Sequence, residues 1–178
     1  MYKAFYKSVS EGCSDKDIQK ISELAKKVIN TDGKFLFAGN GGSMAISCHI
    51  SAELTGRFIK DRPPIKSYVL GSNLSSTTAI ANDYSFSDIF LRDLGCFLEK
   101  EDLVILMSTS GKSKNILDCI NYLKEKEHFN SIILTGKTSN IFSPSLTHIQ
   151  SPSTVTARVQ EHHLFLLHEM CNFIDNLF

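Results

Sequence analysis

The sequence has no excess of charge of either sign and no long apolar run. Among its 178 residues, 19 Lys and Arg balance 19 Asp and Glu, so the formal net charge is zero. Nucleic-acid binders usually carry a basic excess, so we expect no nucleic acid as a partner. No apolar run is long enough to span a bilayer, and the N-terminal stretch MYKAFYKSVSEG lacks the apolar core of a signal peptide. We therefore expect a cytoplasmic protein that makes no membrane contact.

Paired cysteine motifs are also missing. The five cysteines are scattered and form no CxxC pair: Cys13, Cys48, Cys96, Cys119 and Cys171. This pattern is typical of reduced thiols in the cytosol and argues against a disulfide framework. A free Cys is more often a small core residue than a nucleophile, so we assign none of them to catalysis.

What is present is an alternation of apolar strands and amphipathic helices. The 42% apolar and 21% charged residues are typical of one soluble domain, which we expect to span residues 1–178. Strands are predicted at 34–38, 67–70, 102–107, 131–134 and 146–150. Helices are predicted at 1–8, 14–29, 42–55, 74–81, 87–97, 114–125 and 156–177, with a break at Asn82-Asp83. This order predicts an α/β fold, a doubly wound three-layer α/β/α sandwich with a five-stranded parallel sheet and flanking N- and C-terminal helices.

A glycine-rich turn separates the first predicted strand from the helix at 42–55. It reads GNGGS, from Gly39 to Ser43, and strand, glycine turn and helix in this order form a site whose backbone N–H groups face an anion. A dinucleotide fingerprint would need glycine where Met44 stands, and no GK[ST] follows as in a P-loop. We favour a close backbone approach to a sugar or phosphate, with a plain tight turn as the alternative.

A second polar turn follows the strand at 102–107. Its hydroxyl-bearing residues are Ser108, Thr109, Ser110 and Ser113. Hydroxyls and the N–H groups of a helix start are neutral donors suited to a phosphate monoester, although Ser and Thr also serve as simple helix caps. Because both turns follow parallel strands, we expect them to face one crevice at the carboxyl ends of the sheet.

Ionisable side chains lie beyond these turns. His49 and Glu53 are one helical turn apart, where they could bind a divalent metal or transfer a proton. The C-terminal helix adds Gln160 and His168, and His168 stands in an otherwise apolar stretch, which indicates burial beside a polar partner. A structural role is the ordinary alternative for a lone histidine.

Further polar candidates lie at the ends of predicted helices. Asn82 and Asp83 could meet sugar hydroxyls, or they could end one helix and cap the next. Arg57 could reach an anion, or it could balance the C-terminal end of its helix.

Six short motifs occur in order along the chain. They are GNGGS at 39–43, HxxxELTGR at 49–57, AND at 81–83, STSGxS at 108–113, LTGK at 134–137 and RxQExH at 158–163. From about Asp15 to the C-terminus, this set resembles the phosphoheptose isomerase family of sugar isomerase (SIS) domains. The chain departs from the family pattern at Ala157, where an Asp is frequent, and at Lys112, where a small polar residue is common.

The resemblance implies a function and a set of site residues. The family converts D-sedoheptulose 7-phosphate to D-glycero-D-manno-heptose 7-phosphate through an enediol, toward the heptose of bacterial lipopolysaccharide cores or capsules. By resemblance, Glu53 and His168 are the acid/base pair. The implied substrate-binding residues are Asn40, Gly41, Gly42, Ser43, Glu53, Arg57, Asn82, Asp83, Ser108, Thr109, Ser110, Ser113 and Gln160. The implied ligands of one zinc ion per subunit are His49, Glu53, Gln160 and His168.

The resemblance also implies an assembly. Family members have a flavodoxin-like SIS fold and form homotetramers with active sites at subunit boundaries. We expect residues 1–30 to pack in the oligomer and the helix at 156–177 to carry active-site residues. Gln160 and His168 are about 12 Å apart along an ideal helix. One zinc could join them if the helix is distorted, if Gln160 is loosely attached, or if another subunit completes the site.

Two other functions fit the same motifs. Some related SIS domains bind a phosphosugar or a replication-initiation protein without catalysis, but these tend to lose the His/Glu set that this chain keeps. An isomerase for another ketose phosphate is the second alternative, because the phosphate loop alone does not select the sugar.

Overall fold

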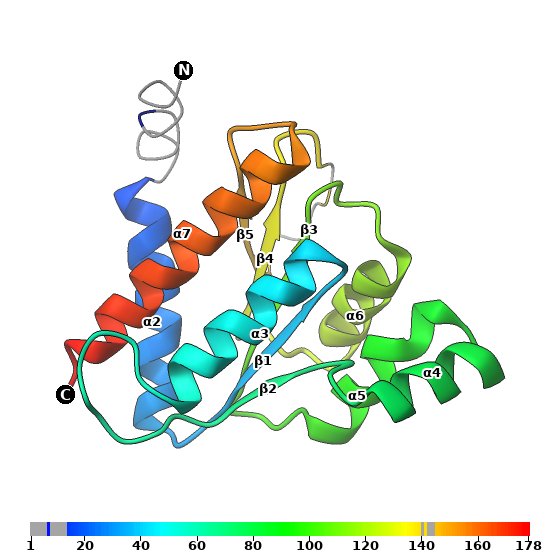
Figure 1. Ribbon diagram of the computed structural model, residues 1–178, viewed down its shortest axis with the longest axis horizontal. Helices are drawn as coiled ribbons and strands as arrows, with labels where there is room; N and C mark the ends of the chain where they lie inside the picture. The colour runs from blue at the N-terminus through cyan, green and yellow to red at the C-terminus, as the bar shows by residue number, and fades with distance from the viewer. Residues whose placement is uncertain (1–6, 8–13, 140, 142–144) are drawn as a thin grey trace.

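The computed structural model describes residue 7 and residues 14–139, 141 and 145–178 (Figure 1). The helix predicted at 1–8 and Cys13 therefore lie outside the described residues, except for Lys7. The elements are α2 (Asp15–Asn30), β1 (Phe35–Gly39), α3 (Gly42–Thr55), β2 (Ser67–Val69), α4 (Leu74–Asp83), a 3-10 turn (Phe86–Asp88), α5 (Ile89–Phe97), β3 (Leu103–Ser108), α6 (Lys114–Glu125), β4 (Ser131–Thr135), β5 (Thr147–Gln150) and α7 (Thr156–Asp175).

The five strands form one parallel sheet in the order β2-β1-β3-β4-β5. This is the flavodoxin-like order, in which ligands bind between β1 and β3, where the order of the strands across the sheet reverses. Gly39 at the end of β1 pairs with Met107 near the end of β3. The two polar turns therefore leave the sheet next to each other, at its switch point.

Helices cover both faces of this sheet, as the three-layer prediction requires. Ile105 and Met107 of β3 belong to the core shared with α2, α3 and α7, whereas Val104 and Leu106 belong to the core shared with α5 and α6. Successive strand residues point to opposite faces, so a strand buried throughout must be apolar at every position. In Figure 1, α2, α3 and α7 lie together on one side of the sheet. The predicted fold class is confirmed.

Most element boundaries agree with the sequence prediction, and α3 and α6 have the predicted bounds. The predicted break at Asn82-Asp83 is wrong, because α4 continues through both residues and Tyr84 is its C-cap. The Tyr84 N–H still reaches the carbonyl of Ile80 at 3.0 Å, and only there does the backbone leave the helical region, with φ −124° and ψ −95°. Short polar residues do not end a helix by themselves when the i−4 hydrogen bonds behind them persist.

The cysteines divide into two groups. Cys119 and Cys171 are buried, whereas Cys48 and Cys96 are exposed, and all four have free thiols. Burial raises the pKa of both buried thiols to about 12, so they stay protonated and behave as small core residues.

None of the helices in the described part of the chain has the length and apolar character needed to cross a bilayer.

Candidate active site

The glycine turn ends β1 and begins α3. Gly41 has φ 55° and ψ −118°, a conformation that residues with a Cβ rarely adopt, so the turn requires glycine there. Gly42 is needed for another reason, since a Cβ on it would lie 2.8 Å from the side-chain amide carbon of Gln160. No side-chain hydrogen bond caps the start of α3. The backbone at this helix start thus faces Gln160 of α7 without a bulky side chain between them.

A pair of amides joins the glycine turn to α6. The Asn40 Nδ2 donates to Asn115 Oδ1 at 2.9 Å, and the Asn115 Nδ2 donates back to Asn40 Oδ1 at 2.9 Å. Asn115 is buried in the first turn of α6. Sequence reasoning missed Asn115, although an Asn two residues after the last hydroxyl of the turn is the kind of signal that could have suggested it. The pair fixes the side chain of Asn40, a predicted sugar contact, with both of its polar atoms engaged.

The hydroxyl loop lies on the other side of this amide pair. Ser108 donates its Oγ–H to the Ser113 Oγ at 3.1 Å, and the Ser110 Oγ accepts from the Lys112 backbone N–H at 3.1 Å. Ser113 occupies the N-cap position of α6, but its side chain makes no capping hydrogen bond. Simple helix capping therefore does not account for Ser113. The first turn of α6 and the loop hydroxyls together form a neutral donor set of the kind that suits a phosphate.

The ionisable residues meet further along α3. The His49 Nε2 lies 3.0 Å from the His168 Nε2 and 3.5 Å from the Glu53 Oε1. The Phe58 ring stacks on the His168 ring, with 5.4 Å between centroids. Helix α7 thus brings His168 onto the face that His49 and Glu53 share. We call these three residues the His49–Glu53–His168 cluster.

The electrostatics of this cluster favour a neutral His168. Burial lowers the pKa of His168 and the neighbouring His49 lowers it further, while Glu53 and Glu169 act in the opposite direction. A contact between two Nε2 atoms also requires that one of them carry no proton. The cluster therefore places a pair of imidazoles, which can both donate and accept a proton, beside a carboxylate, and general acid–base catalysis needs such groups.

Gln160 lies apart from this cluster. It covers Gly42 at the start of α3, whereas His168 contacts His49 two turns later, and α7 is α-helical from Thr156 to Asp175. Helix distortion therefore does not bring Gln160 and His168 together. Within the described ranges, no group of three or more His, Cys, Asp or Glu side chains is identified as able to hold a metal ion.

The remaining predicted residues have local contacts. The Asn82 Nδ2 donates to the Asp83 Oδ1 at 2.8 Å at the exposed end of α4. The Arg57 Nη1 donates to the carbonyl of Ile59 at 3.4 Å, and the Arg57 side chain is exposed. All three residues are exposed, so a ligand can reach them.

Comparisons with known proteins agree on one family. Residues 2–136 match the family model described as SIS domain. The chain is 38% identical over 164 residues to the phosphoheptose isomerase of Azoarcus sp. (strain BH72), covering 90% of this chain and 83% of that protein. It is 37% identical over 162 residues to phosphoheptose isomerase 1 of Campylobacter jejuni, covering 90% and 87%.

Solved structures give the same picture. The phosphoheptose isomerase from Francisella tularensis superposes with a TM-score of 0.90 at 27% identity, covering 98% of this chain and 94% of that one. The phosphoheptose isomerase from Neisseria gonorrhoeae superposes with a TM-score of 0.86 at 29% identity, covering 98% and 95%. The similarity thus extends over nearly the whole fold.

Proposed function

The chain belongs to the phosphoheptose isomerases of the SIS-domain family, and from this premise we propose that it converts D-sedoheptulose 7-phosphate to D-glycero-D-manno-heptose 7-phosphate. The observation that carries the proposal is the His49–Glu53–His168 cluster. A domain that only bound a phosphosugar would need the donor loops but no proton-transfer groups. The cluster therefore favours the isomerase over the non-catalytic alternative.

The proposed chemistry moves one proton between neighbouring carbons. Glu53 removes a proton from C1 of the open-chain ketose while the acid form of the histidine pair gives a proton to O2, which yields a cis-enediol. The enediol then takes a proton at C2 and loses the O1 proton, which leaves the aldose and restores both side chains. A carboxylate and an imidazole suit this exchange, because each can take up one proton and release it again during the reaction.

The two polar turns serve binding in this proposal. Ser108, Thr109, Ser110 and Ser113 hold the phosphate together with the start of α6, and the glycine turn with Asn40 contacts the sugar. The phosphate is remote from the reacting carbons, so its binding energy orients the other end of the chain. Gln160, Asn82, Asp83 and Arg57 remain proposed sugar contacts.

The donor types of the cluster also suit a zinc ion, although its three side chains do not form a ready three-ligand group among the described residues. Two ligands of one tetrahedral zinc lie roughly 3.4 Å apart when their bonds are about 2.1 Å long. The separations of His49 Nε2 from His168 Nε2 and from Glu53 Oε1, 3.0 Å and 3.5 Å, are close to this spacing. We propose that these three residues hold the ion, and that Gln160 joins them only where another subunit brings it near. Such an ion would polarise the substrate carbonyl.

A homotetramer with active sites between subunits completes the proposal. Gly42 and Glu53 are eleven residues apart on α3, about 16 Å along its axis. One chain therefore presents its binding turns and its acid/base groups as two separate parts. Exposed apolar side chains on and beyond α4, Leu74, Tyr84 and Phe86, are surfaces that an assembly would cover. We place the enzyme in the cytoplasm, supplying heptose for lipopolysaccharide or capsule.

A time course of purified protein with sedoheptulose 7-phosphate, followed by NMR, tests the function. We expect conversion to the manno-heptose phosphate, and a lower rate after chelation that added zinc restores. A ketose that protects the fold against heat without being converted would instead indicate a binding module or an isomerase for another sugar. A rate insensitive to chelator would remove zinc from the proposal and leave the acid/base roles.

A further inference from the structure

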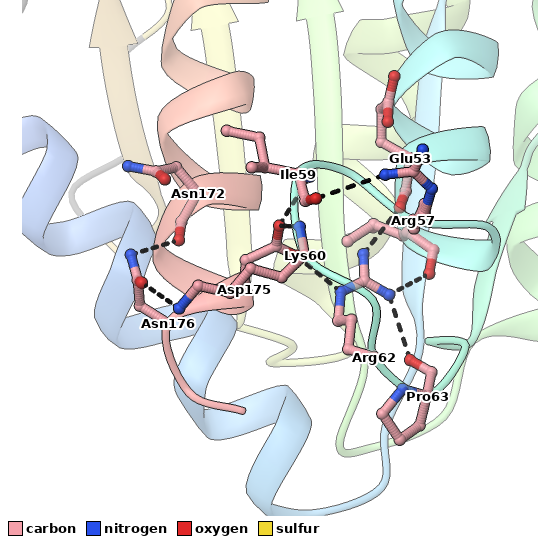
Figure 2. A network of polar contacts seen from close by, with 10 residues as sticks. Glu53, Arg57, Ile59, Lys60, Arg62, Pro63, Asn172, Asp175 and Asn176 are labelled. Carbon is pink, nitrogen blue, oxygen red and sulfur yellow. Dashed lines mark hydrogen bonds and ion pairs between the residues drawn. The ribbon is translucent and has the colours of Figure 1, made fainter.

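A buried arginine holds the C-terminal end of α3. The Arg62 side chain is fully buried, and its Nη2 donates to the carbonyl of Glu53 at 2.7 Å while its Nη1 donates to the carbonyl of Leu54 at 2.9 Å (Figure 2). The last carbonyls of a helix have no partner inside the helix and need one from elsewhere. Arg62 thus anchors the backbone of Glu53 itself.

Asp175 anchors the same arginine to α7. The Asp175 Oδ1 accepts from the Arg62 Nε at 2.9 Å, and its Oδ2 accepts from the backbone N–H groups of Ile59 and Lys60, both at 2.8 Å (Figure 2). All of these contacts lie at the end of α7, two turns beyond His168. One carboxylate therefore ties the segment 57–62 to the helix that carries His168.

The segment 57–62 also bears on the acid/base groups. It contains Phe58, whose ring stacks on His168. Its next two residues, Ile59 and Lys60, are the ones whose N–H groups Asp175 holds. The position of Phe58 against His168 is therefore set by the same network that fixes the end of α3 at Glu53.

We propose that Arg62 and Asp175 are positioning residues for the acid/base pair of the isomerase, holding Glu53 through its backbone and His168 through Phe58. This inference rests on the proposed function. Neither residue touches the reacting atoms. A displacement of about 1 Å between reacting groups can cost a hundredfold in rate, so a buried clamp at this junction has a direct effect on turnover.

The chain contains a matched control for this clamp. Asp102 is also buried, and it too accepts from two backbone N–H groups, those of Lys34 at 3.0 Å and Glu99 at 2.8 Å, and pairs with one cation, the Lys34 Nζ at 2.8 Å. Its contacts are in the segments that precede β1 and β3, and none of these residues belongs to α3, α7 or the segment 57–62. Losing the Asp102 charge therefore removes the same kinds of interaction without touching the clamp.

The test compares Asp175→Asn with Asp102→Asn in the sedoheptulose 7-phosphate assay, at a temperature below the melting transition of each. We expect Asp175→Asn to lower kcat by roughly ten- to a hundredfold with KM within about twofold, because the phosphate loop is not part of the clamp. We expect Asp102→Asn to keep both constants. Equal kcat values for the two variants would overturn the inference.

Phe58→Leu is the second variant, in case Asp175→Asn does not fold. It leaves every hydrogen bond of the clamp in place and removes only the aromatic ring against His168. We expect a kcat lowered by at least about threefold with KM unchanged, and a wild-type kcat would overturn the inference. The wild-type protein separates the proposed function from the positioning role of Arg62 and Asp175. An inactive wild type would remove the proposed function and the positioning role with it. An active wild type with unaffected variants would remove the positioning role alone.

Discussion

The two ends of α3 differ in the chemistry that surrounds them. At its start, the glycine turn, which includes Asn40, faces the amide of Gln160 and leaves the sheet beside the hydroxyl loop at 108–113. In its second half, imidazoles and a carboxylate meet in the His49–Glu53–His168 cluster. Neutral donors bind an anion without changing protonation state, whereas proton transfer requires groups that do change it. The difference indicates that binding and chemistry are separated along one helix.

The ends also differ in how they are anchored. The start of α3 is tied to α6 by two neutral hydrogen bonds between Asn40 and Asn115, whereas its end is tied to α7 by the ion pair of Arg62 and Asp175. Burial by itself would raise the pKa of Asp175, but the N–H groups of Lys60 and Ile59 and the Arg62 guanidinium outweigh it and hold the pKa below its usual range. Damage to the ionic anchor should therefore cost more than damage to the neutral one.

The largest expected effect is on chemistry at the second half of α3. Glu53→Gln keeps the size of the side chain and removes the proposed base, so we expect kcat to fall by roughly 10²- to 10⁴-fold with little change in KM. Glu169→Gln is the control, because Glu169 is the other carboxylate that acts on His168. The measurement is the NMR time course for both variants. Equal losses in the two, or a Glu53→Gln variant with near-normal turnover, would remove Glu53 from the mechanism.

Next in size is the stability of the ionic anchor. Asp175→Asn leaves Arg62 fully buried without its counterion, which should lower the free energy of unfolding by about 3–5 kcal/mol. Asp102→Asn should cost about 1–3 kcal/mol, because Lys34 is 19% exposed and keeps its contact with Glu99 at 2.7 Å. Urea unfolding of both variants at pH 7 measures the difference. A larger loss for Asp102→Asn would contradict the ranking of the two aspartates.

A third prediction separates the histidines of α7. His163 is buried and its Nε2 lies 3.2 Å from the carbonyl of Thr135, and burial lowers its pKa to about 4. In the unfolded chain, the pKa of this imidazole is about 6.5. Between about pH 6.5 and pH 4, His163 therefore binds a proton in the unfolded chain but not in the folded one. The free energy of unfolding should consequently fall as the pH drops through this range. The loss from this residue should reach about 3 kcal/mol at most.

Unfolding of the wild type and of His163→Gln across this pH range measures that contribution. We expect a shallower pH dependence in the variant, together with normal turnover at neutral pH, because His163 serves packing and His168 serves chemistry. A variant with the wild-type pH dependence would assign the effect to other histidines.

Local signals predicted the elements that position the site. The bounds of α3 and α6 follow from the glycine turn and the hydroxyl loop that precede them, and the parallel sheet follows from the alternation of strands and helices. The pairing of His49 with Glu53 on one face likewise requires only helix geometry. Within each of these features, the residues that determine the structure lie close together in the sequence.

The anchors could not be predicted in the same way. Asn40 and Asn115 are 75 positions apart, and Arg62 and Asp175 are 113 positions apart. Each pair is brought together by how helices pack on the sheet, and no local periodicity specifies which polar residue will be buried opposite which. Gln160 illustrates the same point, since its place over Gly42 depends on how α7 lies along α3.

The smallest expected effect tests the neutral anchor. Asn115→Ala removes both hydrogen bonds to Asn40 and leaves that side chain free to turn away from the substrate, so KM should rise by about tenfold, equivalent to about 1.4 kcal/mol, while kcat stays near normal. Asn121→Ala on the exposed face of α6 is the control and should change neither constant. The opposite pattern, a lower kcat at unchanged KM, would mean that the start of α3 also sets the geometry of the chemistry. Binding and proton transfer would then share one rigid unit, and the separation between the two ends of α3 would be a difference in composition alone.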